Sequence, residues 1–169
     1  MHIIETSRLI IKEYSYDDIQ KLSIILSSPK TMSFWEAPFT LQQTENWVNN
    51  NIKRYEELAF GRWAIILKET GELIGDCGIM DSELAGKQEK DLGYIIHHPH
   101  WRNGLAFEAA DGCKEYAFNN LGIKRLCANM AFDHIASRRV AEKVGMKKEK
   151  EFYNNRNRNI LTYLYSIQI

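Results

Sequence analysis

The chain lacks several features that define large classes of proteins. Its 169 residues contain no apolar run long enough to span a bilayer, and the N-terminus lacks the basic-then-apolar pattern of a signal peptide. The formal net charge is +0, so no global field favours nucleic acid or an anionic membrane. Linkers, low-complexity tracts and internal repeats are also missing. We therefore expect a single cytoplasmic domain over residues 1–169, without a membrane or nucleic-acid partner.

Cysteine is scarce, and the pattern of metal-binding residue types is weak. Cys77, Cys113 and Cys127 are odd in number, far apart and set in apolar segments, which predicts buried free thiols in a reducing compartment. His97 and His98 adjoin each other, but strand alternation would send their side chains to opposite faces. No cysteine or carboxylate stands near them at metal-ligand spacing, so we expect no metal.

Apolar periodicity predicts a mixed α+β domain. The expected strands cover 8–14, 62–68, 72–80, 91–97, 124–130, 149–153 and 160–169. Helices are expected at 19–26, from Thr40 through Tyr55, from Gly104 to Gly122, and at 135–144. The polar residues 81–88 are expected to connect two strands. The strand–helix–strand unit in the middle predicts a right-handed crossover and local parallel pairing.

The stretch from Tyr94 to Glu108 is the most informative part of the sequence. It predicts an apolar strand, a turn marked by Pro99, and a helix that begins after Gly104. The free N–H groups and the dipole at such a helix start suit a phosphate or pyrophosphate. A glycine lets the backbone approach that anion closely. The sequence therefore predicts a cofactor that carries phosphate.

Three blocks of sequence resemble the GNAT acetyltransferases, in the branch related to RimJ and RimL. The first is Gly93-Tyr94-Ile95-Ile96 followed by His98-Pro99 and Trp101-Arg102-Asn103-Gly104-Leu105-Ala106, which is similar to the acetyl-CoA motif Gln/Arg-x-x-Gly-x-Gly/Ala. The second is the run from His134 to Met146, similar to Asn-x-x-Ser…Glu-Lys-x-Gly-Phe/Met. The third is Thr6-Ser7-Arg8-Leu9-Ile10-Ile11-Lys12, which looks like the first strand of that branch.

The resemblance implies a GNAT fold and acetyl-CoA as the acetyl donor. The fold has a central mixed, largely antiparallel sheet with one splayed parallel strand pair, flanked by about four helices. Pantetheine would bind the exposed edge of strand 91–97. The implied contacts to the acetyl-CoA molecule are Tyr94, Ile95, Ile96, Arg102, Asn103, Gly104, Leu105, Ala106, Phe107, His134 and Ser137.

The resemblance also implies two catalytic residues. A neutral amine attacks the thioester, and Asp91 would accept its proton through a water molecule. The alternative for Asp91 is an exposed carboxylate at a strand end. Ser137 would hydrogen-bond pantetheine or donate a proton to the leaving thiolate, and its alternative role is to cap the helix that follows. Many other GNAT enzymes carry a tyrosine acid four residues after this serine, where this chain has Ala141.

Trp35 and Glu36, in the aromatic loop 28–40, are the candidates for binding the acceptor amine. The alternatives are core packing for the tryptophan and a solvated loop charge for the glutamate. Arg156 and Arg158, in the loop 154–159, are either solvated or border the same pocket and favour an acidic acceptor peptide. The predicted function is acetyl-CoA-dependent N-acetylation of a primary amine, on a protein N-terminus or a small molecule, by direct attack in a ternary complex. The alternative is a non-catalytic acyl-CoA sensor or partner-binding module. Dimers are common among similar proteins, so a homodimer is also considered.

Overall fold

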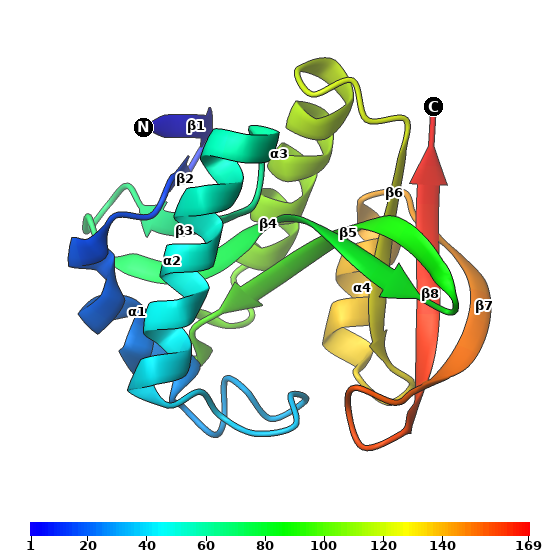
Figure 1. Ribbon diagram of the computed structural model, residues 1–169. Coiled ribbons are helices and arrows are strands. Elements are labelled where there is room, and N and C mark those ends of the chain that lie inside the picture. Colours follow the sequence, from blue (N-terminus) through cyan, green and yellow to red (C-terminus); the bar gives the residue numbers. More distant parts are fainter.

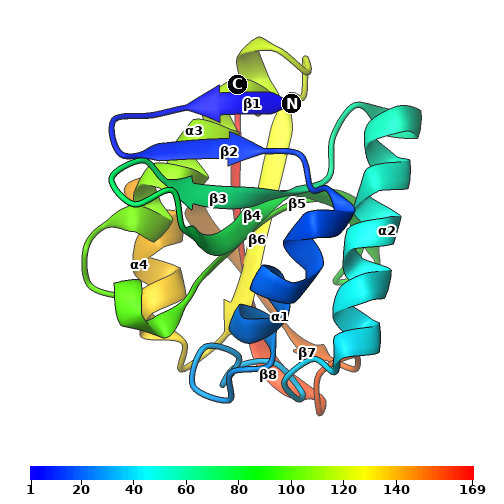
Figure 2. The same cartoon turned by 90° about the vertical axis from the view of Figure 1, so that its left-hand side faces the viewer.

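The computed structural model describes residues 1–169 and shows one eight-stranded sheet with helices on both faces (Figures 1 and 2). The elements are β1 (His2–Glu5), β2 (Leu9–Lys12), η1 (Tyr16–Asp18), α1 (Ile19–Leu26), α2 (Leu41–Leu58), β3 (Arg62–Leu67), β4 (Leu73–Leu84), β5 (Lys87–Ile96), η2 (His98–His100), α3 (Leu105–Asn119), β6 (Arg125–Ala131), α4 (Ile135–Lys143), β7 (Lys147–Asn154) and β8 (Ile160–Gln168). The helices and the parallel pair confirm the predicted mixed α+β architecture. None of the helices has the length and apolar composition needed to cross a bilayer.

The sheet order is β1-β2-β3-β4-β5-β6-β8-β7, and every neighbouring pair is antiparallel except β5–β6. The crossover from β5 through α3 to β6 gives that one parallel pair, as the strand–helix–strand pattern predicted. Two apolar clusters cover the two faces of the sheet. The larger joins Trp63 and Ile65 to α3 and α4, and the smaller joins Ala64 and Ile95 to α1 and α2.

Local sequence signals explain where several elements begin and end. Thr40 caps α2 by accepting a hydrogen bond from the Gln43 amide, while Gln43 Oε1 accepts from the Thr40 amide. Gly71 has a φ of +71° in the β3–β4 connection, which is the conformation expected of a glycine at that turn. The start of α2 at Thr40 agrees with the helix expected from the sequence.

Two sequence predictions were wrong in their extent. Strand β1 was not expected, because its four residues are too few to show a clear alternation of apolar and polar side chains. It lies at the edge of the sheet. The polar residues 81–88 do not form an irregular connection. They extend β4 and β5 into a longer hairpin in which Asp81 pairs with Lys90, and the turn at Ala85 and Gly86 has positive φ at both residues. Most of this hairpin arm is polar, and its buried Leu84 packs against Cys127 of β6 and Leu164 of β8.

Candidate active site

The parallel strands β5 and β6 separate soon after they meet. Asp91 is the one β5 residue that pairs with β6, opposite Cys127. The following residues of β5, from Leu92 to Ile96, keep their partners on β4 but have none on β6. The splayed pair predicted from the sequence is therefore present. It leaves a backbone edge on β5 that an extended, amide-containing ligand can pair with.

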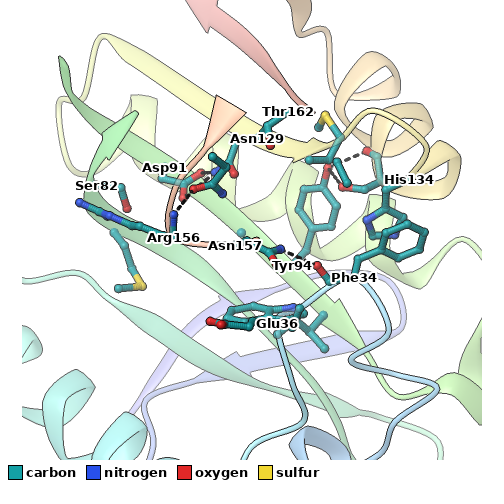
Figure 3. A pocket seen from close by; sticks show the side chains of 18 of the residues that line it. Phe34, Glu36, Ser82, Asp91, Tyr94, Asn129, His134, Arg156, Asn157 and Thr162 are labelled. Carbon is teal, nitrogen blue, oxygen red and sulfur yellow. Dashed lines mark hydrogen bonds between the residues drawn. The ribbon is translucent and has the colours of Figure 1, made fainter. Parts of the chain in front are cut away.

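A cavity of about 660 Å³ opens beside this gap (Figure 3). Its walls come from the loop before α2, from β4, β5 and β6, from the start of α4, and from the β7–β8 connection. The cavity brings together eight residues that the sequence analysis singled out: Trp35, Glu36, Asp91, Tyr94, Ile95, His134, Ser137 and Arg156. Residues more than 100 positions apart in the chain thus share one pocket.

Side chains of β5 alternate between the two sides of the sheet at this gap. Tyr94 packs against the cluster formed with α3 and α4, whereas Ile95 belongs to the cluster formed with α1 and α2. Asp91 and Gly93 share the face of Ile95 because successive strand residues point to opposite faces. The gap is therefore flanked by a carboxylate on one face and by a phenol on the other.

Asp91 is a partly buried carboxylate in a polar niche. Its two oxygens each accept a hydrogen bond from Asn129 Nδ2 on β6 at 3.2 Å. Burial raises the pKa of Asp91 to about 6, although Arg62, Asn129 and Ser82 act in the opposite direction. The alternative of an exposed strand-end carboxylate is wrong. A carboxyl with this pKa is ionised at neutral pH and can accept a proton.

Ser137, in the first turn of α4, lies on the other side of the gap. Tyr94 Oη donates to the Ser137 carbonyl at 2.8 Å and accepts a hydrogen bond from Ser137 Oγ at 3.3 Å. Burial raises the pKa of Tyr94 to about 12, so the phenol stays protonated and remains a donor. No side-chain hydrogen bond caps α4. The sequence analysis placed Tyr94 only through its backbone and missed its hydroxyl, because the link to α4 depends on the tertiary arrangement.

The predicted phosphate-binding turn lies at the start of α3. Arg102 and Gly104 both have positive φ, at 64° and 74°, and no side chain caps the helix. The N–H groups of Leu105, Ala106 and Phe107 are in the first turn of α3, where an α-helix leaves its amides without intrahelical partners.

Two contacts from outside the turn hold it in place. Trp101 Nε1 donates to the Ile96 carbonyl at 2.7 Å, which joins the turn to β5. Arg8 Nη1 donates to the Asn103 carbonyl at 2.8 Å, and Arg8 Nε forms an ion pair with Glu108 at 2.6 Å. Glu108 also accepts from Thr6 Oγ1 and from the Arg8 amide. The N-terminal segment therefore braces the phosphate-binding turn.

Phe34, in the aromatic loop, stacks on the residue that precedes α4 at one end of the cavity. The rings of Phe34 and His134 stack with centroids 3.8 Å apart, and Asn157 Nδ2 donates to the Phe34 carbonyl at 2.9 Å. Figure 3 shows this stack at the opposite end of the pocket from Asp91. Burial lowers the pKa of His134 to about 4, so its ring is neutral. The loop is thus held by α4 and by the β7–β8 connection.

The other acceptor-side candidates are divided between the pocket and its surroundings. Trp35 lines the pocket and makes edge contacts with Phe39 and Trp47, while Glu36 lines it as an exposed carboxylate. Arg156 also lines the pocket, and Arg158 does not. Trp35 is therefore neither purely core nor purely solvent-facing.

Arg62, which lines the pocket, and its buried partner Asp76 were not identified by the sequence analysis. Arg62 and Asp76 form a buried ion pair in which Arg62 Nε donates to Asp76 Oδ1 at 2.6 Å. The other carboxylate oxygen accepts from Tyr14 Oη at 2.5 Å and from Trp47 Nε1 at 2.9 Å. In the sequence, each of Arg62 and Asp76 is a charged residue within an otherwise apolar strand, and a charged residue in such a strand can indicate a functional position.

The histidines and cysteines show no arrangement that would hold a metal ion. His97 and His98 lie with ring centroids 5.1 Å apart, and the closest carboxylate contact is between His100 Nε2 and Glu72 at 3.5 Å. No group of three or more histidine, cysteine or acidic side chains is arranged to hold a metal ion. All three cysteines are buried and free, with the Cys77 and Cys113 sulfurs 3.4 Å apart.

Comparisons with known proteins agree with this geometry. Residues 8–147 match the family model described as an acetyltransferase (GNAT) domain. The uncharacterized N-acetyltransferase YoaA of Bacillus subtilis (strain 168) is 32% identical over 150 residues, which cover 87% of this chain and 84% of YoaA. A GNAT-family acetyltransferase from Bacillus anthracis superposes with a TM-score of 0.84 at 25% identity, over 99% of this chain and 98% of the other. The ribosomal-protein-S5-alanine acetyltransferase of Vibrio fischeri shares the fold, with a TM-score of 0.81 at 14% identity over 97% and 94% of the two chains.

Proposed function

The chain belongs to the GNAT acetyltransferase family, and we propose that it transfers the acetyl group of acetyl-CoA to a primary amine in a ternary complex. The acceptor amine belongs to a protein N-terminus or to a small molecule. The observation that carries this proposal is the pair of functional groups on the two sides of the β5–β6 gap. Asp91 lies on the acceptor side, and Ser137 with Tyr94 lies on the opposite side.

Acetyl-CoA would bind mainly through the backbone. The β5 edge from Tyr94 to Ile96 has no β6 partner. Apart from the Ile96 carbonyl, which accepts from Trp101 Nε1, its outward-facing peptide groups can pair with pantetheine. The pyrophosphate would accept from the amides between Arg102 and Phe107, where the start of α3 provides donors and a favourable dipole. A free N–H on the β5 edge would also stabilise the thioester oxygen as it gains negative charge.

The reaction needs one proton acceptor and one group beside the leaving sulfur. The amine nitrogen forms a bond to the acetyl carbon, the carbon–sulfur bond breaks, and the amine proton passes through a water molecule to Asp91. Coenzyme A leaves as a thiolate that accepts a hydrogen bond from Ser137 and takes a proton from water, while Asp91 returns the amine proton to the solvent. The Tyr94 hydroxyl supports this serine from β5 and stands beside α4, where this chain has Ala141 in place of the tyrosine of other GNAT enzymes.

Incubation with acetyl-CoA and a panel of amines tests the function. We expect acetyl-CoA to raise the melting temperature of the wild type and of Asp91→Asn, and only the wild type to release coenzyme A at an appreciable rate when an acceptor is present. Binding of acetyl-CoA without turnover of any small amine or N-terminal peptide would instead support a non-catalytic acyl-CoA sensor.

A further inference from the structure

The β7–β8 connection carries two arginines that differ in their surroundings. Arg156 is exposed and lines the pocket, and its guanidinium takes part in none of the ion pairs or hydrogen bonds of the protein. Arg158 does not line the pocket, and its Nε donates to Asn157 Oδ1 at 3.2 Å. The other arginine of the pocket, Arg62, is balanced by its buried ion pair with Asp76. Arg156 is therefore the one arginine lining the pocket that has no counter-charge.

Hydrogen bonds fix the backbone on both sides of Arg156. Its amide donates to Asn154 Oδ1 at 3.1 Å, and the Asn157 amide donates to the Asn154 carbonyl at 3.1 Å. Asn157 Nδ2 also donates to the Phe34 carbonyl at 2.9 Å, which joins the connection to the aromatic loop. Figure 3 shows Arg156, Asn157 and Phe34 around the same pocket. A cation on a fixed backbone loses less conformational entropy on binding a ligand than one on a mobile loop.

The reaction site and the start of this connection lie well apart along β8. Asn129, which donates to Asp91, pairs with Leu164 of β8, and Asn154 pairs with Ile160. Leu164 and Ile160 are four residues apart, which corresponds to roughly 13 Å along the strand. An amine and a carboxylate on one α-carbon are separated by two bonds, whereas an extended polypeptide advances about 3.3 Å per residue. The first residues of a polypeptide can therefore reach from the reaction site to the free guanidinium.

The mouth of the pocket allows such a chain to continue into solvent. Glu36 and Arg156 are both exposed, and Trp35 is 36% exposed. These three residues come from two different loops and line the same cavity. Because Glu36 repels an anionic group and Arg156 attracts one, an acidic side chain of the acceptor has one favourable position at this mouth.

From this arrangement we infer that the acceptor is a polypeptide N-terminus with an aspartate or glutamate at its second or third residue, and that Arg156 binds this carboxylate. The inference rests on the proposed acetyltransferase function and adds the class of acceptor. Guanidinium and carboxylate groups form charge-assisted hydrogen bonds with matching geometry. Since the pair forms at an exposed mouth, its contribution to binding is modest and becomes smaller as salt is added.

Matched peptides test the inference on the wild-type protein. We would measure kcat/KM for short peptide amides that begin with alanine, serine or methionine and carry either glutamate or glutamine at the second or third residue. At one of the two positions we expect glutamate to exceed glutamine by about two- to fivefold at low salt, the effect of one exposed ion pair. This glutamate-over-glutamine ratio should fall toward one at high salt.

The possible results separate the acceptor from the reaction. Equal values for glutamate and glutamine at both positions, or a preference for glutamine, would overturn the inference and leave acetyl transfer intact. Turnover of free amino acids or other small amines, without turnover of any peptide, would have the same consequence. If no amine of any kind is acetylated, the proposed function fails as well.

An arginine variant assigns the preference to its residue. Arg156→Gln removes the charge, and we expect the glutamate-over-glutamine ratio to fall to about one while the Kd for acetyl-CoA stays unchanged. Arg158→Gln, in the same connection and outside the pocket, is the matched control and should keep the wild-type ratio. Both side chains are exposed, so both variants should fold. A wild-type ratio in Arg156→Gln, or an equal fall in Arg158→Gln, would contradict the role of Arg156.

Discussion

The hydroxyl of Tyr94 and the carbonyl of Ser137 are joined by a 2.8 Å hydrogen bond that ties β5 to the first turn of α4. The same hydroxyl accepts from Ser137 Oγ at 3.3 Å. This double link lies on the side of β5 opposite Asp91, where the sulfur of acetyl-CoA is expected to leave. Tyr94 therefore positions both the helix turn and the serine hydroxyl.

Removing only the Tyr94 hydroxyl should reduce turnover more than binding. For Tyr94→Phe we expect kcat to fall by about tenfold, the effect of one lost hydrogen bond in the transition state, with little change in the KM for acetyl-CoA. Steady-state kinetics measure both constants. Tyr116→Phe, on α3, is the control and should behave as the wild type. Equal losses in Tyr94→Phe, Ser137→Ala and the double variant would show that the two hydroxyls act together, whereas independent effects would contradict a shared role.

The raised pKa of Asp91 predicts the pH dependence of the rate. The carboxyl has to be ionised to accept a proton, so kcat/KM should fall as the pH drops through about 6. In Asp91→Asn, this fall in kcat/KM at low pH should disappear, and kcat should be lower by about 100-fold or more. The exposed Asp81→Asn, in the same hairpin, is the matched control. If the kcat/KM of Asp91→Asn still fell as the pH dropped through about 6, the pH dependence would belong to another group.

The same carboxyl should affect stability with a defined sign. The pKa of Asp91 in the folded protein lies above the ordinary value of 3.8, so the folded state binds the proton more tightly. The stability from this residue is present below about pH 4 and is lost as the pH rises through about 6. Asp91→Asn should therefore melt at a higher temperature than the wild type at pH 7.5, and the difference should shrink at pH 4.5. Calorimetry at the two pH values measures this difference in melting temperature. If Asp91→Asn melted at a lower temperature than the wild type at pH 7.5, the buried, ionised Asp91 would not destabilise the folded protein.

The brace on the phosphate-binding turn should influence cofactor affinity alone. Glu108→Ala removes the carboxylate that accepts from Thr6, from the Arg8 amide and from the Arg8 guanidinium. We expect the Kd for acetyl-CoA to rise by about three- to tenfold, the effect of one partly exposed ion pair. Titration calorimetry provides the comparison, with Glu115→Ala on the same helix as the control. An unchanged Kd would mean that the turn keeps its shape without Arg8.

Gly93 should tolerate no side chain. Alanine would put its Cβ atom against Arg62 Nη1, next to a guanidinium held by Asp76 and Trp47. We expect Gly93→Ala to lower the free energy of unfolding by about 1–3 kcal/mol or more, as overpacking does. Gly122→Ala, whose Cβ would meet nothing within 4 Å, carries only the strain of positive φ and serves as the comparison in urea unfolding. Equal losses in the two variants would argue against the close packing at Gly93.

Much of the fold was predictable because its signals are local. Thr40 with Gln43, Gly71 and the turn before α3 all act within a few residues of sequence, and each predicted element formed. The polar hairpin arm at 81–88 was missed because polarity usually indicates a loop, while these strands pair with each other and bury Leu84 against distant strands. Asp91 and Ser137 came from family motifs. Arg62, Asn129 and the Tyr94 hydroxyl did not, because their roles depend on which strand faces a distant helix or carboxylate.

The most direct test of acetyl transfer is mass spectrometry of acceptor amines after incubation with acetyl-CoA and the purified protein. The arrangement of Asp91 and Ser137 around the β5–β6 gap predicts an N-acetylated product and an equal amount of free coenzyme A with the wild type, and at most a trace of product with Asp91→Asn. Equal product from both proteins would contradict Asp91 as the base. Absence of product from every amine, free amino acids and N-terminal peptides included, would contradict the enzymatic function.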